Sequence, residues 1–395
     1  MDWTAEQLEL KNSIINLAEA LNENYLCQEK HAEFSFKNWQ LIKDIGIIAL
    51  PIHRKHGGLE QNILTTMLIL ETLGNCCEDA GLNFVVASHI ANITIPIQIF
   101  GTDDQQAKYL PCLCSGNKIG AHTFAEAGSI TDAFSKGTWA IKNDQGYLLN
   151  GRKVFISCPL ADLFVVYACT KNNSFFLDSF SAFLVDRSTP GLKIGHPIEK
   201  MGLRTAPLCE LYFDNCQLSS YQLLGQEGQG VSIFNYVTKW AALCFFAIHL
   251  GEMAHLVSKC IEYYKFRNQY SREPIFKFQS IAHKIVNMKI GLESARTLLY
   301  KTGNKFQQGK NTNVNLAITK VAASENYVRA ALEAIQIFCA YGYIHETGIE
   351  KHLRNAIAST IYSGTVDTVA SIIGLFGPES YKPCYDQFYS YLNDL

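Results

Sequence analysis

Several side chains with hydrogen-bonding or acid–base capacity gather in the segment IYSGTVD, residues 361–367. Tyr362 and Ser363 stand before its glycine, and Thr365 and Asp367 stand after it. Hydroxyl groups both donate and accept hydrogen bonds, whereas an ionised carboxylate only accepts them. The segment can therefore hold a polar ligand. A serine without a partner base has too high a pKa to take a proton from carbon, so Ser363 alone indicates no acid–base reaction.

The chain has the size and composition of a multidomain globular protein. Its 395 residues are 48% hydrophobic and 18% charged, which predicts two or three domains with a large buried core. A formal net charge of −2 favours neither nucleic acid nor an anionic membrane as a partner. The N-terminal residues lack the pattern of a secretory signal. The most apolar stretch, residues 240–257, contains two histidines and a glutamate, which indicates a buried helix and not a membrane span.

The cysteines indicate a reducing compartment. There are 13 of them, an odd number, and several lie inside apolar runs, such as Cys169 and Cys244. Buried free cysteine behaves as a small hydrophobic residue. Cys112 and Cys114 form a C-x-C pair, but no second pair lies at the spacing of a zinc site. We therefore expect reduced structural thiols, no metal centre and a cytoplasmic location.

The spacing of apolar residues changes twice along the chain. It is helical over roughly residues 1–115, alternates with the period of strands over about 118–222, and becomes helical again from 228 onward. The pairs NG at 150–151 and TPG at 189–191 predict turns. The predicted class is mostly α with a central β-domain, divided as 1–117, 118–227 and 228–395. The last domain is expected to contain four helices, at about 230–268, 275–308, 313–341 and 347–375.

Seven motifs in this order resemble the acyl-CoA dehydrogenase family of flavoproteins over roughly residues 38–375. They are LPIHRKHGGLE, IFGTDDQQAKYLPCLCSGNKIGAHTFAEAGSITDA, GYLLNGRKVFIS, EKMGLRTAPLCELYFDNCQL, LLGQEGQG, REPIFKFQS, and AIQIFCAYGYIHETGIEKHLRNA with YSGTVD. The resemblance implies an N-terminal helical domain, a middle β-barrel-like domain and a C-terminal four-helix bundle. It also implies FAD, an acyl thioester substrate, possible delivery by an acyl carrier protein, and a homodimer or homotetramer.

The resemblance also assigns cofactor contacts. The family's Trp-Ile-Thr triplet over the flavin becomes Phe155-Ile156-Ser157, although Phe155 in the core of a plain strand is an alternative. Two departures stand out: Ala125 replaces a threonine of the flavin loop, and Cys339-Ala340 replace two glycines. Arg267 is also compatible with a solvated helix, because its motif carries one extra residue. The expected FAD contacts are Phe155, Ser157, Thr131, Arg267, Tyr270, Gln279, Gln336, Thr365 and Asp367.

Ser363 occupies the position where the resemblance places the catalytic glutamate. Relatives that carry this carboxylate on another helix would place it, with its neighbouring arginine, at Ala241 and Ala242. The chain therefore lacks the usual base at both positions. By the resemblance, Ser88, His89 and Tyr362 line the acyl pocket. His89 can act as a base or remain a satisfied core histidine.

Three functions are compatible with these residues. The first is an FAD-dependent oxidoreductase acting on acyl-CoA or a carrier-tethered acyl group in a specialised biosynthetic pathway, with chemistry that does not use a carboxylate at residue 363. The second is a flavin monooxygenase, because a small residue at 363 leaves room beside the flavin. The third is a non-catalytic thioester-binding protein.

Overall fold

A computed structural model describes residues 3–126, 137–157, 159–170, 179–266, 268–269, 273–274, 279–362, 364 and 366. The chain divides into two compact units, residues 1–248 and 249–395. The division falls inside the long helix α8 (Gly230–Phe266). Within the described residues, helices come first, strands follow and helices return, which confirms the predicted fold class.

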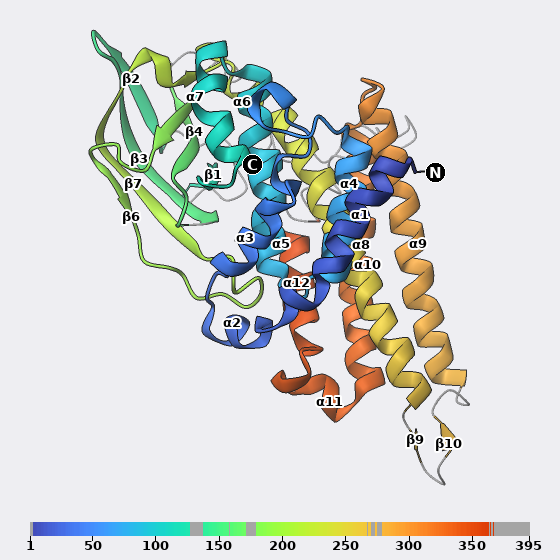
Figure 1. The fold of residues 1–395 in the computed structure, drawn as a ribbon. Coiled ribbons are helices and arrows are strands. Elements are labelled where there is room, and N and C mark those ends of the chain that lie inside the picture. The colour runs from blue at the N-terminus through green and yellow to red at the C-terminus, as the bar shows by residue number, and fades with distance from the viewer. Residues whose placement is uncertain are drawn as a thin grey trace, which may run out of the picture. The chain divides into compact units, whose positions relative to one another are not determined.

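The first unit begins with α-helices and short helical turns. Thr4 and Thr102 begin two of these helices with reciprocal capping boxes to Gln7 and Gln105. Helices α1 and α4 lie side by side (Figure 1). The α-helices are α1 (Ala5–Asn22), α2 (Tyr25–His31), α3 (Phe36–Asp44), α4 (Ile63–Cys76), α5 (Ala80–Ser88), α6 (Ile95–Phe100) and α7 (Asp103–Cys114). The turns are η1 (Ile47–Ala49), η2 (Arg54–His56) and the π-helical η3 (His89–Thr94).

An eight-stranded sheet follows in the same unit (Figure 1). Its order is β6-β7-β3-β2-β4-β5-β8, and β1 pairs with β4 in parallel. Every residue of β4 is buried, and the inward side chains of the neighbouring strands form one apolar core. The strands are β1 (Gly120–Thr123), β2 (Trp139–Asn143), β3 (Gly146–Ser157), β4 (Leu163–Cys169), β5 (Phe180–Asp186), β6 (Leu192–Ile194), β7 (Leu208–Leu218) and β8 (Leu223–Leu224), with the turn η5 (Ser220–Gln222) before β8.

The predicted turn at residues 150–151 is wrong. Both residues lie inside β3, where the pairing with β7 shifts register between Leu149 and Gly151. Gly151 has a φ of +139°, and a Cβ there would come within 2.6 Å of Thr138 Cα. An Asn-Gly pair tolerates positive φ, and a β-bulge uses that property as well as a turn does. The turn predicted at 189–191 is confirmed, since Leu192 N donates to Thr189 O at 3.1 Å.

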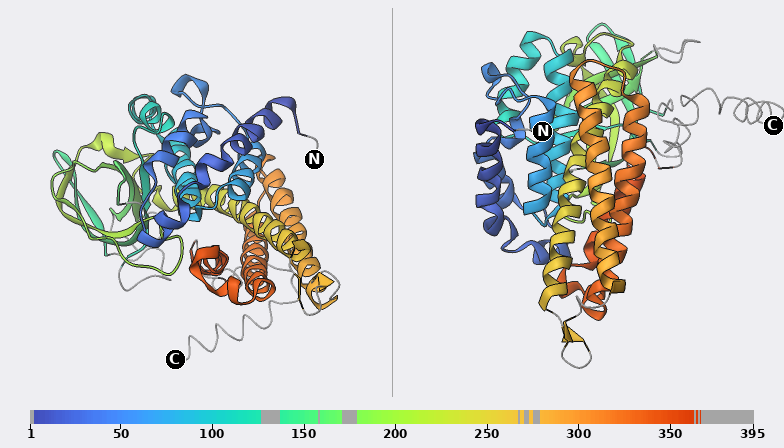
Figure 2. Two further views of the ribbon diagram at one scale, coloured as in Figure 1. Left: turned by 60° about the horizontal axis from the view of Figure 1, so that its bottom comes forward. Right: turned by 90° about the vertical axis from the view of Figure 1, so that its right-hand side faces the viewer.

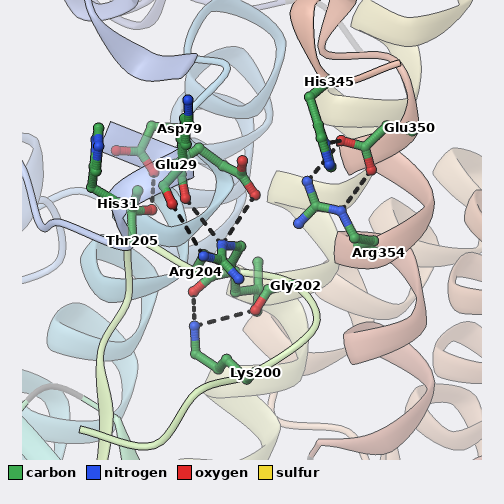
Figure 3. Close-up of polar contacts among 12 residues, drawn as sticks. Glu29, His31, Asp79, Lys200, Gly202, Arg204, Thr205, His345, Glu350 and Arg354 are labelled. Atoms are coloured by element: carbon green, nitrogen blue, oxygen red, sulfur yellow. Dashed lines mark hydrogen bonds and ion pairs between the residues drawn. The ribbon is translucent and has the colours of Figure 1, made fainter. Parts of the chain in front are cut away.

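A loop before β7 binds the ends of two helices (Figure 3). Arg204 donates to the carbonyl oxygens of Glu29 at 3.0 Å and Lys30 at 3.2 Å, in the last turn of α2. A guanidinium is favourable there because the carbonyls at a helix C-terminus carry partial negative charge. The hydroxyl of Thr205 donates to the carboxylate of Asp79, which caps the start of α5. The loop thereby joins α2 and α5 to the start of β7.

The second unit is helical. It contains the end of α8 together with α9 (Gln279–Gln307), α10 (Asn313–Phe338), α11 (Ala340–Tyr343) and α12 (Glu350–Ile361), the turn η7 (His345–Thr347), and the short strands β9 (Asn268–Gln269) and β10 (Glu273–Pro274). Helices α9 and α10 run side by side (Figure 2). Tyr263 on α8 stacks on Phe338 of α10 with ring centroids 4.0 Å apart. Each of the four predicted helical segments contains one of the long helices α8, α9, α10 and α12.

Two helical stretches of the described chain are long and apolar enough to cross a membrane, Ala80–Phe100 and Gly230–Lys265. Inside the protein, 94% and 67% of their most apolar windows are buried. This is the behaviour of core helices. It confirms the prediction of a buried helix for residues 240–257.

Candidate functional site

Two segments expected to contact a flavin lie next to each other in the first unit. The backbone N–H of Val154, on β3, donates to the carbonyl of Ala125 at 2.9 Å. Lys153 Nζ donates to the carbonyl of Phe124 at 3.2 Å and to Glu126 Oε1 at 2.7 Å. Residues 122–126 and 153–157 therefore form one structural unit, although about 30 residues separate them in sequence.

A buried ion pair holds these segments together. The side chains of Lys153 and Glu126 are 3% and 5% exposed. Glu126 also accepts hydrogen bonds from the backbone N–H groups of Gly137 and Thr138 at 2.9 and 3.0 Å. Burial lowers the pKa of Lys153, while the neighbouring Glu126 carboxylate favours its charged form. The glutamate thus joins three pieces of backbone at one point.

Phe155 lies beside this ion pair in an unusual backbone conformation. Its φ is +55°, and the pairing of β3 with β7 is irregular between Lys153 and Ile156. Positive φ is rare for a bulky residue and is found where a site demands it. The bulge leaves Phe155 48% exposed, so the alternative of a core phenylalanine does not describe it. Ser157 ends the same strand and is partly exposed.

Replacing Phe155 with alanine is expected to weaken FAD binding on the order of 3- to 10-fold, because one aromatic stacking contact contributes about 0.5–1.5 kcal/mol. Fluorescence titration of the flavin-free protein with FAD measures this change. Ile141→Ala is the matched control, since Ile141 is an exposed apolar residue on the same sheet. Equal dissociation constants for Phe155→Ala and the unmodified protein would place the flavin elsewhere.

An aromatic cluster adjoins the same segments. Phe124 stacks on Phe234 with centroids 3.8 Å apart, and the rings of His122 and Tyr167 meet at 5.1 Å. His122 Nε2 and the hydroxyl of Tyr167 are buried and have no hydrogen-bond partner within the described chain. Burial lowers the pKa of His122 to about 3, so the ring is neutral. One of its nitrogens can therefore accept a hydrogen bond. Flat apolar rings with unused polar atoms at their edge fit an isoalloxazine ring.

His89 is buried at the start of the π-helical turn η3. Its Nε2 is 3.0 Å from the carbonyl of Leu113, and its Nδ1 accepts from the N–H of Gly120 at 3.3 Å. Burial lowers the pKa of His89 to about 4. With both nitrogens bound to backbone, the ring has the arrangement of a core histidine. Ser88 precedes it, and its hydroxyl accepts a hydrogen bond from Asn92 at 3.1 Å.

The remaining predicted residues fall into two groups. Gln279 begins α9 and Gln336 lies in the last turn of α10, both exposed. Cys339, which replaces a family glycine, has a φ of +54°, so the glycine-like backbone is retained without glycine. The residues that lie outside the described chain are Thr131, Arg267, Tyr270, Ser363, Thr365 and Asp367.

The second unit contains a buried polar cluster that sequence reasoning missed. His249 and Glu252, on α8, are each 3% exposed, and His249 Nδ1 is 2.7 Å from Glu252 Oε2. His249 Nε2 contacts the hydroxyl of Tyr362, the residue that precedes Ser363. The signal in the sequence is H-x-x-E, one helical turn apart within a strongly apolar helix.

Comparison with known proteins assigns the family and the fold. Three family models match: "Acyl-CoA dehydrogenase, N-terminal domain" at residues 4–117, "middle domain" at 121–216 and "C-terminal domain" at 228–375. The chain belongs to the acyl-CoA dehydrogenase family. It is therefore an FAD-dependent oxidoreductase that acts on acyl thioesters, and the reading as a non-catalytic binding protein is excluded.

Several relatives within the acyl-CoA dehydrogenase family are similar over nearly the whole chain. An L-prolyl-[peptidyl-carrier protein] dehydrogenase of Pseudomonas fluorescens is 34% identical over 94% of this chain and 98% of its own length. A protein of the same name from a Serratia species is 36% identical over 87% and 89%. Among solved structures, the prolyl acyl carrier protein oxidase AnaB has a TM-score of 0.91 and 36% identity, over 95% of this chain and 99% of its own.

Proposed function

We propose that this enzyme oxidises an L-prolyl group carried as a thioester on a peptidyl-carrier protein, as a step in a biosynthetic pathway. The observation that carries the proposal is the match, at 34–36% identity and over most of both chains, to two enzymes named for that substrate. A solved structure named "PigA with FAD and proline", 33% identical with a TM-score of 0.91, supports the same substrate and cofactor.

The chain's own residues fit the cofactor part of this reaction. Bound FAD supplies the electron acceptor. We place it against Phe155, Ser157, His122 and Phe124, with further contacts from the other predicted cofactor residues. Those are Gln279 and Gln336, together with Thr131, Arg267, Tyr270, Thr365 and Asp367. Stacked rings at this position would cover part of the flavin and limit the access of water to it.

The substrate end is proposed from the resemblance. Ser88 and Tyr362 would line the acyl pocket, with His89 supporting its wall. Because both nitrogens of His89 are bound to backbone groups, we assign it no proton transfer.

Intact-mass analysis of a loaded carrier protein tests the function. Carrier protein bearing an L-prolyl thioester is expected to lose two hydrogens, or four after two rounds, when incubated with the enzyme. Two control substrates are tested in parallel. One is the carrier protein bearing a D-prolyl thioester, and the other is butyryl-CoA. Oxidation of butyryl-CoA but not of the prolyl thioester would overturn the proposal. A gain of one oxygen atom that requires an external reductant would replace it with the monooxygenase reading.

We further propose the three-domain division 1–117, 118–227 and 228–395, a cytoplasmic location and a homodimer or homotetramer. All 11 cysteines within the described chain are free thiols, which suits a reducing compartment. Light scattering of the purified enzyme during size-exclusion chromatography measures the number of subunits.

A further inference from the structure

Three side chains of the buried cluster in the second unit form a linear chain of hydrogen bonds. Glu252 Oε2 accepts from His249 Nδ1 at 2.7 Å. This contact leaves Nε2 as the acceptor of a neutral imidazole, and the hydroxyl of Tyr362 donates to it. The order is therefore carboxylate, imidazole and phenol, and the phenol belongs to the residue that precedes Ser363 in the sequence.

Neighbouring groups fix this chain from both sides. The hydroxyl of Tyr327 lies 3.5 Å from His352 Nδ1, and burial, together with the nearby Glu252 carboxylate, raises the pKa of this phenol. Lys320 Nζ contacts the carbonyl oxygens of Tyr362 and Gly364, the residues on either side of Ser363. Tyr362 and Gly364 are thus anchored to α10 through Lys320.

Packing does not account for the cluster. Removing a carboxylate from water costs several kcal/mol, and replacing a buried polar set with apolar residues of similar volume is often neutral or stabilising. The cluster combines the three types of group that together move a proton. Tyr362 is a donor, His249 is a base, and Glu252 is a carboxylate that can stabilise the charged base.

We propose that Glu252, His249 and Tyr362 form a proton relay that replaces the missing carboxylate base. The proposal rests on the function proposed above. The bond between hydrogen and the carbon next to the thioester carbonyl breaks, and its proton passes to Tyr362 Oη while the phenolic proton passes to His249 Nε2. Glu252 stabilises the resulting imidazolium. The electron pair of that C–H bond would form the new double bond, and bound FAD would supply the acceptor for the hydride that leaves the neighbouring atom.

Tyr362 is suited to the outer position of the relay. Burial raises the pKa of its phenol well above the ordinary value, so the group is protonated at rest. Because the phenol gains one proton as it gives up another, its charge does not change, and His249 is the net proton acceptor. Glu252 acts through His249 and is a positioning residue.

Hydrogen–deuterium exchange at the carbon next to the thioester carbonyl tests the relay without cofactor turnover. The enzyme is first reduced with dithionite, so that no oxidation competes. Exchange into the L-prolyl carrier thioester and into butyryl-CoA is then followed in D₂O by mass spectrometry. His249→Gln and Tyr362→Phe are expected to slow exchange on the order of 100-fold or more. The thioester concentration for half-maximal rate should not change. Glu252→Gln is expected to slow exchange less.

His345→Gln is the matched control, because His345 is a histidine of the same unit whose side chain is 84% exposed. Flavin content and circular dichroism check that each variant is folded. If His249→Gln fails this check, Tyr362→Phe, which removes a single hydroxyl, decides the result. Equal exchange rates in the folded variants and the unmodified enzyme would overturn the relay, and so would the absence of exchange into either thioester. Exchange into butyryl-CoA alone would overturn the prolyl substrate while leaving the relay testable.

Discussion

Replacing Lys153 with methionine is expected to lower the free energy of unfolding by about 3–5 kcal/mol, because it leaves the buried Glu126 carboxylate without its cation. The two backbone N–H groups that also bond to Glu126 cannot neutralise its charge. The variant is expected to lose FAD as well, since this ion pair joins the segment at 122–126 to the strand that presents Phe155. Urea unfolding followed by far-UV circular dichroism measures the first effect, and flavin absorbance per protein measures the second.

Two further variants show whether the effect belongs to the pair. Lys153→Met combined with Glu126→Gln is expected to recover part of the lost stability, because the uncompensated charge is then absent. Lys142→Met, on β2, removes a lysine whose side chain is 67% exposed and is expected to change stability by less than about 0.5 kcal/mol. A Lys153→Met protein as stable as the unmodified enzyme would show that the buried carboxylate is satisfied without the lysine.

The second large effect is a loss of stability in acid that depends on His89. Burial lowers the pKa of His89 from 6.5 in the unfolded chain to about 4 in the folded protein. Between these values the unfolded chain binds a proton that the folded protein does not. The contribution of His89 is therefore complete above about pH 6.5 and is lost as the pH falls toward about 4, a total of roughly 3 kcal/mol.

His89→Gln isolates this contribution, because glutamine keeps one donor and one acceptor for the carbonyl of Leu113 and the N–H of Gly120 but does not titrate. Between about pH 7 and about pH 4.5, the unmodified protein is expected to lose roughly 2–3 kcal/mol more than the variant in urea unfolding. Burial lowers the pKa of His122 as well, so its protonation destabilises both proteins equally in acid. This contribution cancels when the two pH profiles are subtracted. Parallel pH profiles for the two proteins would show that His89 accepts a proton in the folded state.

The helices could be predicted closely because apolar spacing alone determines them. The helices predicted at 230–268 and 313–341 are observed as α8 (Gly230–Phe266) and α10 (Asn313–Phe338). The turn predicted at residues 150–151 was wrong because its conformation depends on a distant strand and not on local spacing. Whether a backbone with positive φ reverses the chain or forms a bulge depends on the partner strand β7, which lies more than 50 residues away.

The site was only partly predictable from sequence. The motifs located Phe155 and Ser157, but the strained backbone of Phe155 comes from a register shift that local sequence does not encode. His249 and Glu252 were visible only as polar residues that argued against a membrane span. Their partner Tyr362 lies 113 residues from His249, so no spacing rule connects them. Interactions at such a distance require the fold.

The left-handed backbone of Phe155 has a consequence for engineering this enzyme. A residue with a side chain is disfavoured in that conformation by roughly 1–2 kcal/mol relative to glycine. Selection of variants for heat resistance in the absence of FAD would therefore favour glycine or asparagine at residue 155. The same substitutions would remove the ring on which we expect the flavin to rest. Thermostability and cofactor retention are then opposed at a single position, and selection should be carried out with FAD present.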